Sequence, residues 1–370
     1  MNYTDRFGVE PAEESCNPRD LIERIAETIK TLVIVPEGTE LAIALWIVHT
    51  SLIEPAGEHQ VFRVSPILAI NSPDRQCGKS VLCEVVMSLC PRPKLSMNLT
   101  ESVLFRSMEL EQPTLFIDEA DTFINKSRDS LIGILNAGHR PDGSVDRMGG
   151  KNFDEIRSFK VWGAKAIVGI GDLPDTLSSR CIHIRMKRKL PHEYVQRLNT
   201  FRRENPDCFL NLRRQLVRLI VDIKGKVDEL VVSMPEELDD RQQDNWEPLF
   251  KIALVCDESL YFRAVELALT MRSHTPEQIN IGVMLLEDVR LAFHKSGQPR
   301  ISSADLLIAL NSDDTRPWVT YSSGRPLSAR QVSELLRPYG IRPRDLRING
   351  PTCKGYERAD FEDAFLRYLS

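Results

Sequence analysis

A short stretch, Ser72–Ser80, combines residue types that bind phosphate with a position that suits phosphate binding. It follows the apolar, β-prone run Phe62–Ile70 and precedes a segment with apolar residues at helical spacing. Backbone N–H groups at the start of such a helix cradle phosphate oxygens, and a glycine lets the backbone approach them closely. We therefore expect a nucleotide to contact the residues of this loop, namely Pro73, Asp74, Arg75, Gln76, Cys77, Gly78, Lys79, Ser80 and Val81.

The end of the loop, Gly78-Lys79-Ser80, supplies a positive charge and a metal ligand. The Lys79 ammonium would bind the β and γ phosphates, and the Ser80 hydroxyl would bind Mg²⁺. Pro73 stands where most loops of this kind have a glycine. The alternative interpretation is a helix that begins with a solvated lysine.

A second motif carries two acids at the end of a predicted strand. Thr114–Ile117 is β-prone, and Asp118 and Glu119 follow it directly. Asp118 would hold Mg²⁺, directly or through water, and Glu119 would orient and polarise an attacking water. A strand that ends in solvated acids is the alternative. Because both motifs follow strands, where α/β sheets bind ligands, we predict binding of ATP and Mg²⁺ and hydrolysis of ATP.

A third segment, 166–181, resembles the part of AAA+ ATPases that runs from sensor 1 to the arginine finger. A strand is followed by Gly171 and Asp172, then by a Leu-Pro-Asp turn and a short helix that ends in Ser179-Arg180. The resemblance implies that Arg180 is a catalytic residue that stabilises γ-phosphate charge in a neighbouring subunit. It makes Asp172 the sensor 1 candidate, although Asn or Thr is usual there. A surface arginine before an edge strand is the alternative.

Several motifs occur from about residue 30 onward, namely Ser72-Pro73, Cys77–Ser80, Phe116–Asp121, Gly169–Leu177, Asp240-Arg241, Asp244–Trp246 and Arg337–Pro343. Together they are similar to one family, catalogued as domain of unknown function 3631. The family occurs in phage, plasmid and genomic-island proteins, often behind a primase. The resemblance implies an AAA+ motor for the DNA of a mobile element. Arg241 is a candidate sensor 2 residue, with an arginine paired to Asp244 as the alternative.

Two segments are candidates for DNA binding. Residues 136–160 contain Gly143 and Gly149-Gly150 with β-prone pieces beside them. They resemble the pore hairpin of hexameric helicases, which implies phosphate contacts by Arg147 and Lys151. Charge over 140–160 is nearly balanced, with five Lys/Arg against four Asp/Glu, so a plain solvated hairpin is the alternative.

The second segment, 316–358, has nine Lys/Arg against three Asp/Glu. We predict that it contacts DNA phosphates, and the alternative is a protein-binding or lid role. The predicted contact residues are Arg342, Arg344 and Arg347.

The elements that position these residues predict an α/β fold, namely a P-loop AAA+ parallel sheet core with a helical lid and a C-terminal winged-helix-like module. Strand candidates at 62–70, 114–117, 166–170 and 181–186 alternate with helical stretches, as in a parallel sheet covered on both faces. We predict a leader with helices at 1–58, the ATPase core at 59–190, the lid at 191–310 and the winged-helix-like module at 311–370.

Composition limits the class of protein. The chain has 370 residues, 27% of them charged, and a net charge of −5, which excludes a uniformly basic coat for nucleic acid. The N-terminus lacks a secretory pattern, and the most apolar stretch, 41–48, is too short to cross a bilayer. Eight cysteines without C-x-x-C spacing favour reduced thiols and a cytoplasmic location.

These observations favour a DNA-translocating ATPase, a hexameric replicative helicase of a phage or mobile element. Its expected partners are single-stranded or forked DNA, further copies of the chain in a ring, and a primase or other replication protein. One alternative is an ATP-switched assembly or defence ATPase that remodels partner proteins without unwinding DNA. Another is a DNA-binding regulator with a vestigial ATPase, which the intact Lys79, Asp118 and Glu119 disfavour.

Overall fold

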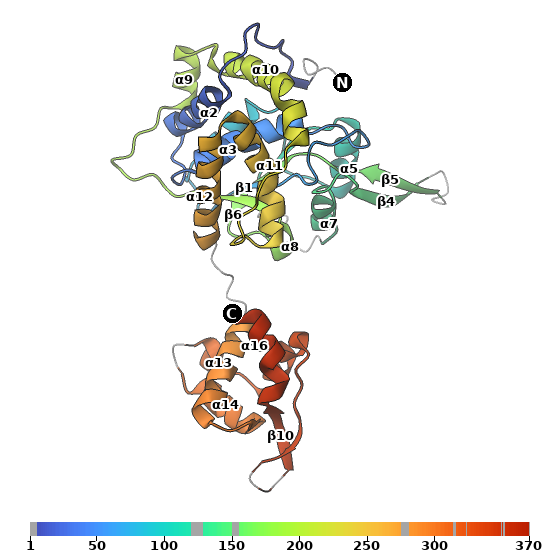
Figure 1. Ribbon diagram of the computed structural model, residues 1–370, viewed down its shortest axis with the longest axis vertical. Coiled ribbons are helices and arrows are strands. Elements are labelled where there is room, and N and C mark those ends of the chain that lie inside the picture. The colour runs from blue at the N-terminus through green and yellow to red at the C-terminus, as the bar shows by residue number, and fades with distance from the viewer. Residues whose placement is uncertain are drawn as a thin grey trace. The chain divides into compact units, whose positions relative to one another are not determined.

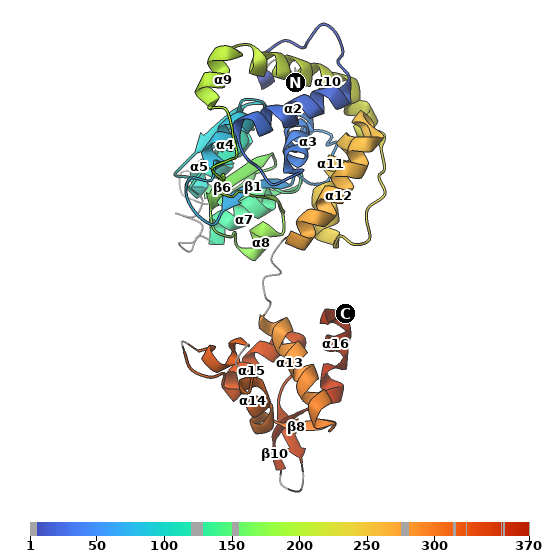
Figure 2. The ribbon, with the colours of Figure 1, turned by 90° about the vertical axis from the view of Figure 1, so that its left-hand side faces the viewer.

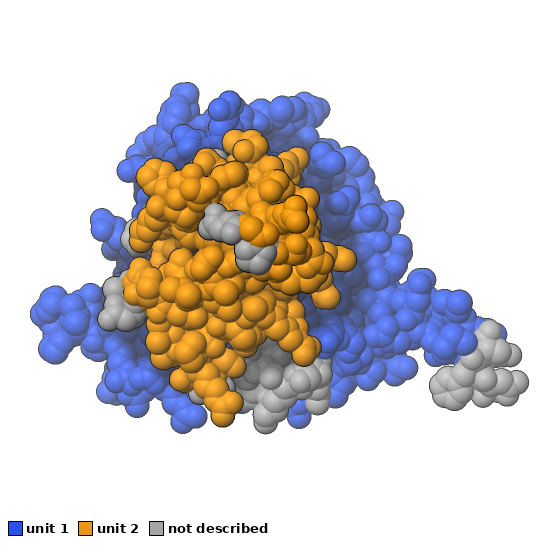
Figure 3. All heavy atoms as spheres, turned by 90° about the horizontal axis from the view of Figure 1, so that it is seen from below, with its two compact units in different colours: residues 1–273 blue, residues 274–370 orange. Residues whose placement is uncertain are grey.

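The computed structural model describes residues 6–119, 129–149, 155–274, 281–313, 316–322, 324–348, 350 and 352–369. The chain forms two compact units, unit 1 at Met1–Ser273 and unit 2 at His274–Ser370, coloured blue and orange in Figure 3. No described helix is long and apolar enough to cross a membrane.

A five-stranded parallel sheet lies at the centre of unit 1 (Figure 1). Ile70 of the central strand lies opposite Val168 on one side and Ile184 on the other. Every residue of this strand is buried, as expected for a parallel sheet covered on both faces. The prediction of a parallel α/β sheet is confirmed. In the order β2-β3-β6-β1-β7, the strands are β2 (Pro93–Ser96), β3 (Thr114–Ile117), β6 (Lys165–Ile170), β1 (Ile67–Ser72) and β7 (Cys181–Arg185).

Helices cover the sheet, and alternate strand residues face two different apolar clusters. Leu68 and Ile70 of β1 belong to the larger cluster, whereas Ile67 and Ala69 belong to the smaller one. The smaller cluster contains residues of α5 (Glu101–Leu110) and α7 (Asp129–Ala137). The larger one contains residues of α2 (Pro18–Leu32), α3 (Thr39–Leu52), α4 (Lys79–Met87), α10 (Cys208–Glu229), α11 (Asp240–Cys256) and α12 (Glu258–His274).

Helix α3 is the core helix of this larger cluster. It is apolar on most sides, and every residue except Glu40 is buried. It packs against α2, α10 and α11 (Figure 2). The indole N–H of Trp46 donates to the carbonyl of Pro66, 2.9 Å away, just before β1. The helices predicted within 1–58 therefore share one hydrophobic core with the sheet predicted for 59–190, and do not form a separate segment.

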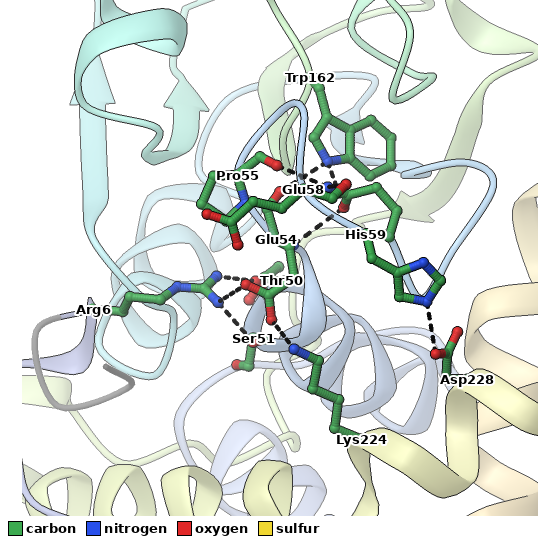
Figure 4. Close-up of polar contacts among 11 residues, drawn as sticks. Arg6, Thr50, Ser51, Glu54, Pro55, Glu58, His59, Trp162, Lys224 and Asp228 are labelled. Carbon is green, nitrogen blue, oxygen red and sulfur yellow. Dashed lines mark hydrogen bonds and ion pairs between the residues drawn. The ribbon is translucent and has the colours of Figure 1, made fainter. Parts of the chain in front are cut away.

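Polar contacts also attach the N-terminal region to α10 (Figure 4). Lys224 of α10 forms an ion pair with buried Glu54, with 2.5 Å between Nζ and Oε1. Arg6 lies 3.9 Å from the same carboxylate and donates to the carbonyls of Ser51 and Thr50. These contacts explain why chain segments far apart in sequence form one unit.

A β-hairpin projects from unit 1, as Figure 1 shows. It consists of β4 (Ser144–Gly149) and β5 (Glu155–Lys160), with Arg147 opposite Arg157. Phe159 is buried against Phe105 of α5, with 4.4 Å between ring centroids. The hairpin predicted within 136–160 is thus present and is held against α5. The shorter helices of unit 1 are α8 (Asp175–Ser178) and α9 (Leu198–Glu204).

Unit 2 begins earlier in the chain than the sequence predicted. Elements assigned to the lid at 191–310 belong to it, because Leu286 and Val289 pack in one apolar cluster with Trp318 and Phe361. Its small antiparallel sheet has the order β8-β10-β9. In chain order the elements are α13 (Ile281–Ser296), β8 (Arg300–Ser302), α14 (Ser303–Asn311), η1 (Pro317–Thr320), α15 (Ala329–Leu336), η2 (Arg337–Tyr339), β9 (Arg344–Arg347), β10 (Thr352–Glu357), η3 (Arg358–Phe361) and α16 (Glu362–Tyr368).

Candidate nucleotide-binding site

The predicted phosphate loop, residues 73–78, joins the end of β1 to the start of α4. Gly78 is the residue before the helix and has a left-handed backbone with φ of 83°. A Cβ atom there would lie 2.8 Å from Cγ2 of Val33. Position 78 therefore favours glycine for two reasons: the left-handed backbone is strained for other residues, and a Cβ would clash with Val33.

The Lys79 ammonium lies against the loop, at the N-terminus of α4. Its Nζ donates to Oγ of Ser72 at 2.6 Å and to the carbonyl of Asp74 at 3.2 Å. Cys77 is buried, and its thiol lies 3.4 Å from the same Asp74 carbonyl. The loop thus combines a lysine charge with the positive end of a helix, an arrangement that favours a bound anion.

The other predicted loop residues differ in exposure. Val81 is half-buried and packs against the larger apolar cluster of unit 1, so its side chain supports the loop from the side of the core. Gly78 and Lys79 are half-buried, and the remaining predicted residues are exposed, namely Pro73, Asp74, Arg75, Gln76 and Ser80.

Sequence reasoning missed a second cation at this loop. Nη2 of Arg188 lies 2.6 Å from Oδ2 of Asp74, and its Nε donates to the carbonyl of Arg75 at 3.2 Å. Arg188 lies beyond β7 and 114 residues from Asp74 in the chain, so no local pattern could have indicated the pair.

Asp118 and Glu119 follow β3 at the sheet edge where the phosphate loop follows β1, because the strands are parallel. The N–H of Glu119 donates to Oδ1 of Asp118 at 2.8 Å, and Glu119 has a φ of 55°, which is uncommon for a residue with a side chain. Burial, together with the charges of Asp118 and Glu84, raises the pKa of Cys83 to about 12. Asp118 is therefore close enough to α4, the helix that carries Ser80, for its charge to act on the Cys83 thiol.

The donors at this edge suit a magnesium ion. The Asp118 carboxylate and the Ser80 hydroxyl are oxygen ligands, and Mg²⁺ binds through one or two carboxylates together with waters and substrate phosphates. Within the described part of the chain, no group of three or more His, Cys, Asp or Glu side chains could hold a metal ion by itself. A cation at this edge would complete its coordination with ligand phosphate and water.

Strand β6 lies between β1 and β3, so its end faces the same edge. Asp172 is exposed there and accepts from Nη1 of Arg185 at 3.1 Å. A buried polar side chain next to this strand end comes instead from the neighbouring strand β1: the amide of Asn71 donates to the carbonyl of Gly171 at 3.1 Å. In the sequence, Asn71 could have been found as the polar residue that directly follows the apolar run of this strand.

Arg180 and Arg241 lie away from the phosphate loop. Arg180 precedes β7, and its carbonyl accepts from the N–H of Ile67 at the start of β1, so it lies at the opposite edge of the sheet. Burial, and next the charge of Arg241, lower the pKa of Arg180. Arg241 is thus close enough for its charge to act on Arg180, and it forms no ion pair with Asp244 among the described residues.

The predicted DNA contacts fall into three groups. Arg147 pairs with Glu101 at 3.3 Å and lies over the ring of Phe105, and Lys151 lies outside the described residues. Arg344 pairs with Glu357 and, at 3.0 Å, with Asp360.

The third group comprises Arg342 and Arg347, one before β9 and one at its end. Both are exposed, and neither forms an ion pair with any residue that the structure describes. Of the three arginines of unit 2 that the sequence predicted as DNA contacts, these two therefore have side chains that no described carboxylate engages.

The geometry defines a mixed α/β protein in which a lysine, a serine hydroxyl and two acids lie at one edge of a parallel sheet. Residues 185–368, about half of the chain, match the family described as "Protein of unknown function (DUF3631)", and this part of the chain belongs to that family. The family resemblance is thereby confirmed for the matched residues. Arg241 and Asn245 lie inside the matched range, whereas the phosphate loop lies before it.

A relative from Saccharopolyspora erythraea is described as "Uncharacterized 28.9 kDa protein in xis 5'region". It is 35% identical over 155 residues, which make up 41% of this chain and 58% of the relative. The chain thus spans less than two thirds of this relative's length, and neither description gives an activity.

Proposed function

We propose that unit 1 is an ATPase of the AAA+ P-loop class that binds ATP and Mg²⁺ at the carboxyl edge of its parallel sheet. One observation carries the proposal: a glycine-bounded loop with Lys79 at a helix start, and Asp118-Glu119 after β3, lie at the same edge. Strand β6 between them occupies the position that a sensor 1 strand requires, since its end is adjacent to both motifs.

In this proposal Lys79 binds the β and γ phosphates and the loop N–H groups bind their oxygens. Ser80 and Asp118 hold the metal ion, which neutralises phosphate charge when bound. Glu119 orients the attacking water and accepts its proton, and its exposed side chain leaves room for that water. Arg188 holds Asp74 and so fixes the shape of the loop.

The position of Arg180 supports a site shared between subunits. The residue lies at the opposite sheet edge from its own phosphate loop, which favours contact with the nucleotide of another copy over contact with its own. This is what an arginine finger in a ring of identical subunits requires, because head-to-tail contacts place one face of a subunit against a different face of the next.

Unit 2 supports DNA as the partner. Its helix–strand–helix–helix–strand–strand order, with β10 between β8 and β9, is the arrangement expected of a winged-helix module. Exposed Arg342 and Arg347 flank β9 and suit phosphate contacts. The proposed whole is a ring-forming motor, a helicase or translocase of a mobile element, that works with a primase or other replication partner.

One observation favours the second candidate, an assembly or defence ATPase that remodels proteins. Arg147 of the hairpin is engaged by Glu101 and Phe105, so this cation is not free to grip a DNA backbone in the described arrangement. DNA-stimulated hydrolysis distinguishes the two, since only the motor requires it.

The ATPase assignment is tested with Lys79→Ala and Glu119→Gln. Loss of the Lys79 contacts should weaken binding of a fluorescent ATP analogue by roughly 10- to 100-fold, the value of charged hydrogen bonds. Glu119→Gln should bind the analogue normally yet release phosphate about 10²- to 10⁴-fold more slowly, because only water activation is lost.

Lys226→Ala is the matched control, because Lys226 is an exposed lysine on α10. It should behave as the unmodified protein in both assays. If Lys79→Ala and Glu119→Gln both hydrolyse ATP at the normal rate, the nucleotide-site assignment is wrong.

A further inference from the structure

A buried amide links α11 to the sheet edge that carries Arg180. Nδ2 of Asn245 donates to the carbonyl of Ser179 at 3.0 Å, and its Oδ1 lies 2.9 Å from Nε2 of His139. Both side chains are buried, with Asn245 3% and His139 1% exposed. The His139 carbonyl in turn accepts from the N–H of Ser65, 2.9 Å away. This bridge fixes where α11 lies relative to Ser179-Arg180.

The bridge brings two arginines together. Arg241 precedes Asn245 by one helical turn and so shares its face of α11, while Arg180 directly follows the residue that Asn245 binds. The charge of Arg241 contributes to the lowered pKa of Arg180, after burial. Burial lowers the pKa of His139 to about 4, and the charges of Arg180, Lys165 and Arg241 add to this effect.

No acid compensates the pair. Among the described residues, neither Arg180 nor Arg241 forms an ion pair with a carboxylate, and both side chains are half-buried. Arg180 donates from Nη1 to the carbonyl of Thr176, which fixes one end of its guanidinium and leaves further N–H donors. Two arginines in the same neighbourhood that form no ion pair with a described acid favour an anionic ligand.

We propose that Arg180 and Arg241 together form one anion site that binds the terminal phosphate of ATP held by a second copy of the chain. The inference rests on the proposed ATPase function and departs from a sensor 2 role for Arg241 in its own subunit. The six residues of β1, roughly 17–20 Å long, separate this edge from the phosphate loop. Asn245 is the positioning residue, because it holds α11 against Ser179 without lying in the phosphate site.

Mixtures of variants separate action in the neighbouring subunit from action in the same subunit. In equal mixtures that form head-to-tail interfaces, about one quarter of interfaces combine an intact nucleotide side with an intact arginine side. If Arg241 acts on the neighbour, Arg241→Ala mixed with Lys79→Ala should recover about that fraction of hydrolysis. Arg241→Ala mixed with Arg180→Ala should recover none, because both changes damage the same side.

If Arg241 acts in its own subunit, the two outcomes exchange: the mixture with Arg180→Ala recovers activity and the mixture with Lys79→Ala does not. That result overturns the inference, as does normal hydrolysis by Arg241→Ala alone. Arg203→Ala, a change of an exposed arginine on α9, is the matched control and should leave hydrolysis unchanged.

Binding and assembly provide readouts that do not depend on turnover. Arg180→Ala and Arg241→Ala should bind the fluorescent ATP analogue as the unmodified protein does, which also shows that they fold. Both should lose the nucleotide-dependent self-association measured by sedimentation velocity with a non-hydrolysable ATP analogue. If Lys79→Ala binds and hydrolyses ATP normally, the ATPase proposal itself fails. If only Arg241→Ala retains normal assembly, the ATPase proposal stands and the inference about Arg241 fails.

Discussion

Acidification should destabilise unit 1 through two buried histidines, His139 of the Asn245 bridge and His49, which is linked to it through Ser65. His49 lies in α3, and its Nε2 is 3.2 Å from Oγ of Ser65, whose N–H donates to the carbonyl of His139. Burial, and then the charge of His139, lower the pKa of His49 to about 3. The pKa of His139 falls to about 4, chiefly through burial. Both rings are therefore neutral in the folded protein at neutral pH.

The sign and size of the effect follow from linkage. Below an unfolded pKa of about 6.5 the unfolded chain binds protons that the folded protein does not, so the free energy of unfolding falls as pH decreases. The fall begins near 6.5 and continues until the folded pKa of each ring is reached. Between about pH 7.5 and about pH 5, each histidine should cost about 2 kcal/mol, and the pair about 4 kcal/mol.

Denaturant unfolding at a series of pH values measures this loss. Three tryptophans, Trp46, Trp162 and Trp246, lie in unit 1 and report its transition by fluorescence. His139→Gln should reduce the pH-dependent loss by about 2 kcal/mol, because the group that titrates is gone. His192→Gln, at an exposed position, is the control. An equal pH-dependent loss in His139→Gln and the unmodified protein would refute the reasoning.

Two further predictions concern the phosphate loop and unit 2. Gly78→Ala should destabilise the protein more than Gly171→Ala. Both changes place a side chain on a left-handed backbone, which costs about 1–2 kcal/mol, but only at Gly78 would the new Cβ also lie 2.8 Å from Val33. Equal losses of stability in thermal melts would contradict this. Arg342→Ala combined with Arg347→Ala should reduce the slope of log DNA affinity against log salt by about 1.4–1.8, or 0.7–0.9 for each lost phosphate contact. Arg367→Ala, which removes an arginine already paired with Asp363, should leave the slope unchanged in fluorescence anisotropy.

The parts of the fold that depend on local pattern could be predicted from the sequence. β3 occupies 114–117 as expected, and β6 and β7 differ from the predicted ranges by a single residue, because apolar runs bounded by turns define short buried strands. The central strand begins at Ile67 rather than Phe62, since Pro66 precedes it and its carbonyl accepts from Trp46. The loop before α4 was recognisable because Gly78, Lys79 and Ser80 are consecutive.

Long-range packing could not be predicted in this way. Amphipathic helices at 281–296 and 303–311 have the same pattern whether they cover the sheet of unit 1 or Trp318 of unit 2, so the predicted boundary at 310 fell too late. The contact between His139 and Asn245 joins residues 106 positions apart, and nothing local to either one indicates it. The same holds for Glu101, which engages Arg147 from a different element.

The sheet of unit 1 places its two groups of charged residues at opposite edges, and this separation limits what one copy of the chain can do. Lys79, Ser80 and Asp118 follow strands, whereas Arg180 precedes one, and strand length keeps the groups apart. A cation that stabilises phosphate charge must be within hydrogen-bonding distance of it, so Arg180 and Arg241 cannot serve the phosphate loop of their own subunit without rearrangement of the sheet. In the proposed ring, two copies arranged head to tail would bring the groups together without such a change. The Asn245 bridge then has a physical purpose in the proposed ATPase, because it holds the donor edge rigid while the partner's nucleotide changes.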